Sequence, residues 1–285
     1  MPEIAYVNGN FLPLEHATVH VEDRGFQFAD GVYEVVRTYN GQAFATDEHV
    51  ARLFRSLAAI ELKVPFGATE LKTLVEEGIK RAGFAEALVY LQITRGQARR
   101  HRGIPAHAEP TVVITVREMP ARPEKLRPDG ISVITVPEFR WERCDIKSIA
   151  LLPSVLAYQT AKKAGAGDAI FVEADGTVNE STAGNVFVVS NGRLRTPPKS
   201  PRILPGVTRD KILETARSIG ILCSEERITI ADLAAADEIF LTSTTAEITP
   251  VVSVDGKLIG SGRPGPISAR LYDEFGRTFV HRRLS

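Results

Sequence analysis

The sequence has little of several features that usually reveal a protein's class. Its two cysteines, Cys144 and Cys223, are too few for a disulfide framework and lack the spacing of metal ligands. Basic and acidic residues balance at 35 each, so the basic excess of a nucleic-acid-binding domain is missing. The P-loop, the H-E-x-x-H zinc motif and a complete dinucleotide fingerprint are also absent. We therefore expect no metal centre and no nucleic-acid partner.

Long apolar runs are also missing. The longest uncharged stretch, Ser148 to Ala161, is shorter than the roughly 20 residues that cross a bilayer, and it contains Pro153. The first residues lack the basic and apolar parts of a signal peptide. We expect a cytoplasmic protein with no membrane partner.

The remaining composition is ordinary, with 44% hydrophobic and 25% charged residues, as in soluble globular proteins. At 285 residues the chain is longer than one core usually supports. Residues 119–130 are rich in proline, glycine and charge, which is typical of an exposed connector. We predict an N-terminal domain over residues 1–120, a connector over 121–130 and a C-terminal domain over 131–285.

Hydrophobic periodicity predicts helices and strands in both domains. Apolar residues recur at helical spacing over residues 47–62, 69–84, 152–165, 208–220 and about 266–279. Alternating segments bounded by turn residues predict strands within 4–14, 31–44, 87–96, 110–118, 131–139, 168–194, 238–244 and 251–259. Because NG and DG turns join several strands, we expect a mixed α/β fold. Each domain would be a largely antiparallel or mixed sheet with flanking helices.

Lys147 stands directly before the longest uncharged run, where a lysine has two possible roles. It can end a strand, bury its stem and keep its ammonium in water, and composition alone favours this interpretation. Alternatively the amine is desolvated and attacks an aldehyde to form a Schiff base. Other residues have to decide between the two.

A Schiff-base cofactor such as pyridoxal 5'-phosphate (PLP) needs a site for its phosphate. Gly206, Val207 and Thr208 stand at an expected helix start, where N–H groups and the helix dipole favour a phosphate. An ordinary loop and helix cap would have the same pattern. Ser243 and Thr244 add hydroxyl groups at the end of an expected strand.

The same cofactor needs an acid beside its pyridine nitrogen. Glu180 precedes the small residues of STAG, so its carboxylate lies beside backbone that a ring can approach closely. Alone, this residue would be interpreted as a surface glutamate.

Five blocks of the sequence carry a resemblance to a known family. They are EDRGFQFADGVYEVVRTYNG, YLQITRG, RWERCDIKSIALL, GVTRD and LTSTTAEITPV. In their order and spacing the chain resembles the PLP-dependent transaminases of fold type IV, and it is most similar to the D-amino acid aminotransferases among them. The resemblance covers nearly the whole chain, and it favours the Schiff-base interpretation of Lys147.

This resemblance implies a role for each candidate residue. Lys147 would form the Schiff base and carry protons, Glu180 would hold the pyridine nitrogen, and Tyr33 would line the substrate side. The other cofactor contacts that it implies are Arg52, Val207, Thr208 and Thr244 at the phosphate and Leu204 against the ring. Gly206 and Ser243 complete the cofactor site predicted from the residues themselves.

Two alignments are possible for the residues that bind the substrate carboxylate, because the family places an arginine and a histidine two residues apart after TRG. Without a gap, Arg100 takes the place of the arginine and Arg102 that of the histidine. A shift by one residue gives Arg99 and His101 instead. We favour Arg100 and Arg102 because they need no gap, and the second pair stays open.

The resemblance implies transamination between a D-amino acid, such as D-alanine or D-glutamate, and a 2-oxo acid. The route would be a ping-pong mechanism through pyridoxamine phosphate, in a homodimer. The same fold leaves open a branched-chain L-amino acid aminotransferase, an (R)-amine transaminase and an aminodeoxychorismate lyase. A rival of another class is a PLP-binding protein without activity. The arginine cluster after TRG favours an α-carboxylate over a simple amine.

Overall fold

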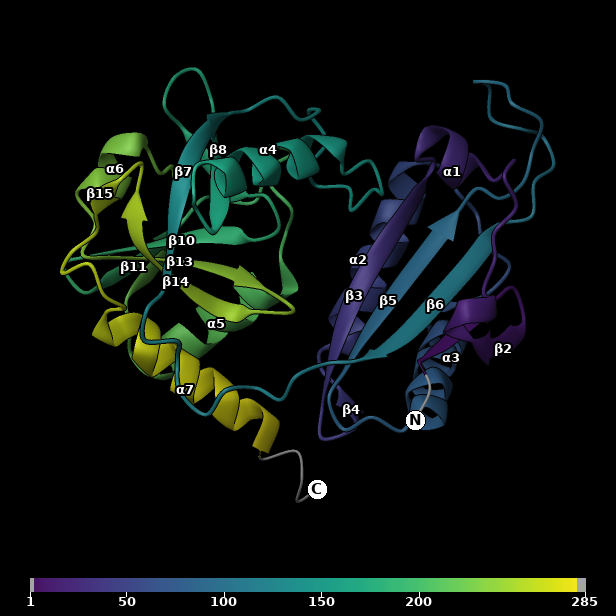
Figure 1. Ribbon diagram of the computed structural model, residues 1–285, viewed down its shortest axis with the longest axis horizontal. Coiled ribbons are helices and arrows are strands. Elements are labelled where there is room, and N and C mark those ends of the chain that lie inside the picture. Colours follow the sequence, from purple (N-terminus) through teal and green to yellow (C-terminus); the bar gives the residue numbers. More distant parts are fainter. Residues whose placement is uncertain (1–2, 281–285) are drawn as a thin grey trace. The chain divides into compact units, whose positions relative to one another are not determined.

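The computed structural model describes residues 3–280, which fold into two units with separate cores (Figure 1). Unit 1 consists of the described residues up to Ala121 together with Ile146–Ala150. Unit 2 consists of Arg122–Asp145 and the described residues from Leu151 onward. The chain therefore returns to unit 1 for the short segment that contains Lys147, which the sequence-based division had placed in the C-terminal domain.

Unit 1 is built on an antiparallel sheet, whose strand order within the described residues is β2-β1-β6-β5-β3-β4. Its strands are β1 (Ile4–Val7), β2 (Asn10–Pro13), β3 (Gly31–Tyr39), β4 (Gln42–Ala43), β5 (Ala87–Thr94) and β6 (Thr111–Glu118). A 3-10 helix, η1 (Leu14–His16), and a short helix, α1 (Arg24–Phe28), lie between β2 and β3 in the chain.

Two amphipathic helices, α2 (Thr46–Ala59) and α3 (Ala68–Ala82), pack against this sheet (Figure 1). Val50, Leu53 and Leu57 recur at helical spacing on α2, and all three are buried. They share one hydrophobic core with side chains of β3, β5 and β6. This core fixes α2 against β3, the two elements that carry Arg52 and Tyr33.

The segment Ile146–Ala150 is held against β3 and α2. The backbone N–H of Tyr33 donates to the carbonyl of Lys147 at 3.0 Å, and the backbone N–H of Lys147 donates to Ser56 Oγ on α2 at 3.2 Å. Ile146 is buried in the core of unit 1. The backbone of Lys147 is therefore tied to two packed elements, which limits where its side chain can reach.

Unit 2 is built on a mixed sheet. Within the described residues its order is β12-β11-β10-β13-β14-β7-β8-β9, with β15 paired to β14. The strands are β7 (Ile131–Pro137), β8 (Asp168–Val172), β9 (Val178–Ser181), β10 (Asn185–Ser190), β11 (Arg193–Thr196), β12 (Cys223–Glu225), β13 (Glu238–Ser243), β14 (Glu247–Val254) and β15 (Lys257–Leu258). The pairs β7–β14, β7–β8 and β11–β12 are parallel.

This sheet closes on itself because β9 also pairs with β10, where Glu180 stands opposite Asn185. The strands β10, β13, β14, β7, β8 and β9 thus form a closed ring. Four helices belong to the unit in the part of the chain that is described: α4 (Leu152–Lys163), α5 (Val207–Ser218), α6 (Ile230–Ala234) and α7 (Pro266–Val280). The helices α5 and α7 pack together against β13, so the start of α5 has a fixed place beside the ring.

The fold class predicted from the sequence is confirmed, since both units combine an antiparallel or mixed sheet with packed helices. Within residues 3–280, every helix falls short of the length and hydrophobicity needed to span a membrane.

Candidate active site

Lys147 is half-buried in unit 1, and its amine lies over the ring of Tyr33. Its Nζ lies 4.2 Å from the centre of that ring. No carboxylate among residues 3–280 forms an ion pair with this amine. An amine that is not held by an acid can react with a carbonyl group, which is the chemistry that the sequence predicts for this lysine.

Arg52 lies on α2, in a buried cluster with Glu34 and His49. Its Nε donates to Glu34 Oε1 at 2.6 Å and its Nη2 to Glu34 Oε2 at 2.8 Å. His49 Nδ1 lies 2.8 Å from the same Oε2. Burial alone would raise the pKa of Glu34, but the hydrogen bonds and charge of Arg52, and then His49, lower it to about 2. The guanidinium is thereby held rigidly by a carboxylate that stays ionised.

Tyr33 is positioned by its place on β3 and by its neighbour Tyr90 on β5. The two rings are stacked, with centroids 5.6 Å apart and an interplanar angle of 27°. Tyr90 donates its hydroxyl to Gln92 Oε1 at 2.6 Å. Burial, and then the proximity of Tyr33, raise the pKa of Tyr90 to about 12, so that its hydroxyl stays protonated. Tyr33 is therefore a fixed phenol beside the Lys147 amine.

The loop after TRG is exposed, and the structure holds only one of its three arginines within the described residues. Arg100 donates from Nη1 to the carbonyl of Gln27 at 3.4 Å, and its guanidinium lies 4.6 Å from the ring centre of Phe28. Arg99 and Arg102 make no polar contact within residues 3–280. The side chain of Arg100 is thus the better ordered of the candidates for the carboxylate.

This loop is anchored by Arg24, a buried arginine of α1. Arg24 Nη1 donates to the carbonyl of His101 at 2.6 Å, and its Nε donates to Asp30 Oδ2 at 2.8 Å. Arg95 Nε donates to the same carboxylate oxygen at 2.8 Å. Burial would raise the pKa of Asp30, but hydrogen bonds from Arg95 and Arg24 and then their charges lower it. The pair of arginines shares one ionised carboxylate and secures the base of the loop.

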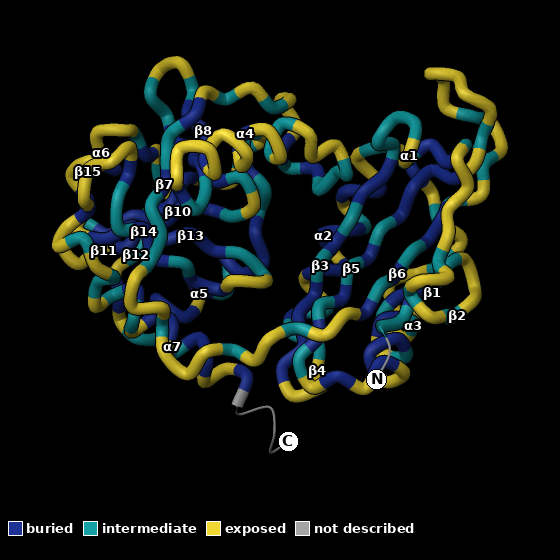
Figure 2. The backbone as a smooth tube through the Cα atoms, viewed as in Figure 1, coloured by how far each residue is buried: buried dark blue, intermediate teal, exposed yellow. Residues whose placement is uncertain are grey.

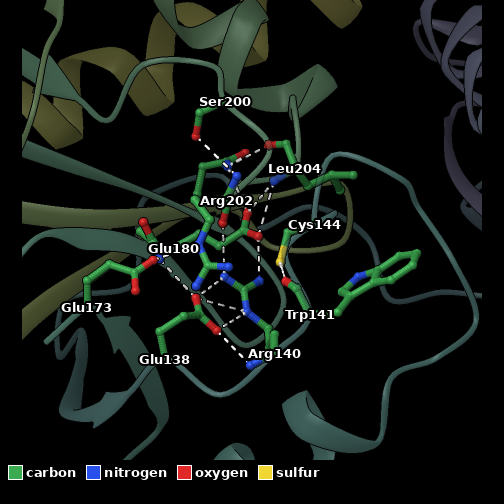
Figure 3. Close-up of polar contacts among 11 residues, drawn as sticks. Glu138, Arg140, Trp141, Cys144, Glu173, Glu180, Ser200, Arg202 and Leu204 are labelled. Carbon is green, nitrogen blue, oxygen red and sulfur yellow. Dashed lines mark hydrogen bonds and ion pairs between the residues drawn. The ribbon is translucent and has the colours of Figure 1, made fainter.

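Glu180 lies in unit 2 at the end of β9, surrounded by donors (Figure 3). Arg140 Nη1 donates to its Oε1 at 2.6 Å, and Asn185 Nδ2 donates to its Oε2 at 3.1 Å. The backbone N–H of Leu204 lies 3.1 and 3.0 Å from the two oxygens. The carboxylate is therefore fixed in place from three directions, in the manner of a preorganised site.

Arg140 in turn is held by a second carboxylate, Glu138 (Figure 3). Its Nη2 donates to Glu138 Oε2 at 2.7 Å and to the carbonyl of Arg202 at 3.2 Å. Burial would lower the pKa of Arg140, but the hydrogen bond to Glu138 and the charges of Glu180 and Glu138 raise it. Burial raises the pKa of the nearby Cys144 thiol to about 11, so this cysteine is an unreactive neighbour.

The residues predicted to bind a phosphate lie at the start of α5 and at the end of β13. Gly206 precedes α5, and no side chain caps the first turn, which begins with Val207 and Thr208. The N–H groups at such a helix end attract an anion. Ser243 Oγ accepts from the N–H of Ala246 at 3.2 Å, so part of its capacity serves its own turn.

These groups fit PLP by their chemistry. In unit 2, Ser181 Oγ and Thr242 Oγ1 are buried and have no hydrogen-bond partner within residues 3–280. A buried hydroxyl without a partner is costly unless a further group satisfies it. Within unit 2, the uncapped start of α5 suits the phosphate of PLP and the fixed carboxylate of Glu180 suits its ring nitrogen. Within unit 1, the amine of Lys147 is by itself the kind of group that reacts with the carbonyl of PLP.

Several residues of these networks were not found from the sequence: Glu34, His49, Glu138, Arg140 and Asn185. The alternation along β3 assigns Glu34 to the face opposite Tyr33, and a buried acid there was a usable signal. Arg140 stands in the quoted block RWERCDIKSIALL, but its partner Glu180 is 40 residues away. Spacing along the chain could not have paired them.

The architecture is that of the PLP-dependent aminotransferases of fold type IV. The chain superimposes on a branched-chain amino acid aminotransferase of Escherichia coli with a TM-score of 0.91 and 29% identity, covering 98% of this chain and 95% of that one. A second branched-chain amino acid aminotransferase, solved with pyridoxamine 5'-phosphate, gives a TM-score of 0.91 at 28% identity, covering 99% and 95%.

The chain belongs to the class IV amino-transferase family, whose model matches residues 31–254. It is 44% identical to a D-alanine aminotransferase of Bacillus licheniformis over 262 residues, 92% of each chain. It is 42% identical to a D-alanine aminotransferase of Listeria monocytogenes over 272 residues, 94% of this chain and 93% of the relative. The family resemblance inferred from the sequence is confirmed, and the protein is a PLP-dependent aminotransferase.

Proposed function

We propose that this aminotransferase moves the amino group of a D-amino acid, such as D-alanine or D-glutamate, to a 2-oxo acid. The observation that supports this most is that the D-alanine aminotransferases match nearly the whole chain at higher identity than the branched-chain enzymes that share its fold. The ordered Arg100 also favours an amino acid over a simple amine, since a guanidinium recognises a carboxylate.

When bound, PLP supplies a carbonyl group for the amine and a ring that takes up electrons from the substrate Cα. In our proposal Lys147 would hold the cofactor through its Nζ, and the same amine would take up the proton that leaves Cα. Its position beside Tyr33 and the absence of an acid partner within residues 3–280 support this role. The backbone contacts of Lys147 to β3 and α2 limit the positions that its amine can reach.

We propose that Glu180 keeps the pyridine nitrogen of the cofactor protonated. A protonated ring accepts electrons better, and an ionised carboxylate favours that proton. Arg140 places a positive charge against Glu180, and hydrogen bonds from Asn185 and Leu204 keep the carboxylate in one orientation. The phosphate and ring contacts that we propose come from Arg52, Leu204, Gly206, Val207, Thr208, Ser243 and Thr244.

For the substrate, we propose that Tyr33 and Arg100 bind the α-carboxylate, with Arg102 as the second arginine. A carboxylate held at two points aligns one hydrogen on Cα with the Lys147 amine, which selects one enantiomer. Arg99 and His101 remain the alternative pair, and the hydrogen bond from the N–H of Gly103 to His101 Nδ1 occupies one nitrogen of that imidazole.

We propose that the protein works as a homodimer in the cytoplasm. The supporting feature is helix α4, much of which is exposed (Figure 2). Its apolar side chains Leu152, Val155 and Leu156 are exposed by 67%, 57% and 54%. Apolar faces of this kind mark interaction surfaces. We propose a second copy of the chain as the partner, because the family resemblance implies a homodimer.

The function is tested by incubating the enzyme with D-alanine and 2-oxoglutarate, with and without PLP. We expect pyruvate and glutamate to form in equal amounts, and only when PLP is present. A PLP-binding protein without activity would form neither product. Faster turnover of (R)-1-phenylethylamine than of D-alanine would replace the proposal with an amine transaminase. Pyruvate release from aminodeoxychorismate, without an amino acceptor, would replace it with the lyase.

A further inference from the structure

We propose that Asn185 is a positioning residue that sets the distance between the carboxylate of Glu180 and the start of α5. This inference rests on the proposed roles of Glu180 at the pyridine nitrogen and of α5 at the phosphate. One side chain would thus hold both ends of the cofactor site in register.

The amide of Asn185 uses its donors on two different segments. Asn185 is the first residue of β10 and is only 4% exposed. Its Nδ2 donates to Glu180 Oε2 at 3.1 Å and to the carbonyl of Leu204 at 2.9 Å. An amide nitrogen has two hydrogens, and each therefore has its own acceptor.

Leu204 closes a triangle of hydrogen bonds. Its backbone N–H donates to the carboxylate of Glu180, while its carbonyl accepts from Asn185. Glu180 and Asn185 also face each other across β9 and β10, at the pair that closes the ring of strands. The triangle is therefore attached to the most constrained part of the sheet.

The carbonyl side of the same amide lies close against the residue that precedes α5. A Cβ atom added to Gly206 would lie 2.0 Å from Asn185 Oδ1, far inside contact distance. Only a glycine allows the backbone to approach the amide this closely. Asn185 thus contacts the residue directly before Val207 and Thr208 as well as the carboxylate of Glu180.

A ligand that binds at both ends of this arrangement depends on their spacing, whereas a ligand that binds at one end does not. PLP carries a ring nitrogen and a phosphate at a fixed separation, and inorganic phosphate offers only the second group. Loosening the spacing should weaken PLP more than phosphate, because rigid sites lose affinity when their preorganisation is lost.

The test uses the full chain freed of PLP, with the fluorescence of its single tryptophan, Trp141, as the signal. Wild type, Asn185→Ala and Asn185→Asp are each titrated with PLP and with inorganic phosphate. We expect PLP affinity to fall by roughly ten- to a hundredfold, since the lost contacts include a hydrogen bond to a charged group. Phosphate affinity should stay within about twofold of wild type, since a single-ended ligand does not sense the spacing.

Thr196→Val is the control for stability, because it removes one buried hydrogen bond, to the carbonyl of Val186, without touching Glu180 or the loop before α5. It should leave both affinities unchanged. If Asn185→Ala does not fold, the PLP and phosphate affinities of the isosteric variant Asn185→Asp are used for the comparison. Equal losses for PLP and phosphate, or no loss of PLP affinity, would overturn the inference.

The same titrations separate this inference from the proposed function. If Glu180→Gln and Thr208→Val both leave PLP affinity unchanged, the assignment of the two ends is wrong. If they weaken PLP while the Asn185 variants do not, only the role of Asn185 is wrong.

Discussion

At the scale of single residues, buried charge explains how the cluster of Glu34, His49 and Arg52 in unit 1 keeps its shape. Glu34 is 1% exposed, yet it stays ionised because Arg52 and His49 surround its carboxylate. Removing one partner of such a pair leaves an uncompensated charge in the core, which is strongly destabilising. The rigidity of Arg52 therefore depends on a residue that the sequence did not suggest.

Glu34→Gln should lower the free energy of unfolding in a way that depends on pH. The pKa of Glu34 is lowered from 4.5 to about 2 on folding, so its stabilising contribution is complete above pH 4.5 and is lost as the pH falls toward 2. We expect a difference of about 3 kcal/mol from wild type at neutral pH, which shrinks through that window.

Denaturant unfolding of both proteins at a series of pH values measures this difference. Glu77→Gln, which breaks an exposed pair with Arg81, is the matched control and should have little effect. A difference that is constant between pH 5 and about 2 would show that the charge of Glu34 is not what stabilises the cluster.

The carboxylate site can be tested by comparing two neighbouring arginines. Arg100→Leu should raise the KM for D-alanine and D-glutamate by roughly ten- to a hundredfold, because a charge-assisted hydrogen bond contributes about 1.5 to 3 kcal/mol. Arg99→Leu should change KM much less. Steady-state kinetics and the PLP content of each variant are the measurements. The reverse ranking would assign the site to Arg99 and His101.

How far single residues could be predicted depended on whether their partners are near in sequence. Lys147 and Glu180 were predicted as site residues because a family resemblance supplied roles that spacing alone could not. Arg140 was missed, since it lies 40 residues from Glu180 and appears from sequence to be one more charged residue in a polar loop. The roles of these residues in catalysis stay predictions.

Long elements were predicted well from the sequence, while short ones were not. The helices α2 and α3 show the buried stripe that periodicity requires, and their predicted ranges differ from the observed ones only at the ends. The helices α1 and α6 contain five residues each, and β12 contains three, too few to show a period. α1 nevertheless matters, because it carries Arg24, which anchors the loop of Arg100.

Substitutions on helix α4 test whether its apolar face is the interface of the proposed homodimer. The double variant Leu152→Asp and Val155→Asp should convert the proposed dimer to a monomer, because charges on the apolar face would have to be buried without partners. Sedimentation velocity over a range of concentrations measures the change.

The control for α4 is Leu222→Asp, which alters an exposed leucine of the same unit outside the helix. It should remain dimeric. A wild-type protein that sediments as a monomer, or a double variant that still dimerises, would remove α4 as the interface.

The fold class of the whole molecule could be predicted from the sequence, but the closure of the sheet in unit 2 could not. Turn motifs and alternating segments predicted sheets in two domains, with a boundary at residues 121–130. The pairing of Glu180 with Asn185, which closes the sheet of unit 2, joins strands across a short turn that no periodicity signals. Likewise, the inclusion of Ile146–Ala150 in unit 1 follows from tertiary packing around Ile146, which local sequence does not encode.

The enantiomer preference of the intact enzyme is the sharpest test of whether it transfers the amino group of D-amino acids. Initial rates are measured with 2-oxoglutarate as acceptor for the D- and L-forms of alanine, leucine and valine, and kcat/KM is compared within each pair. We predict that the D-form is preferred in every pair and that D-alanine is the best donor of the set. Faster turnover of L-leucine or L-valine than of any D-amino acid would contradict it, because the carboxylate would then be held for the opposite enantiomer.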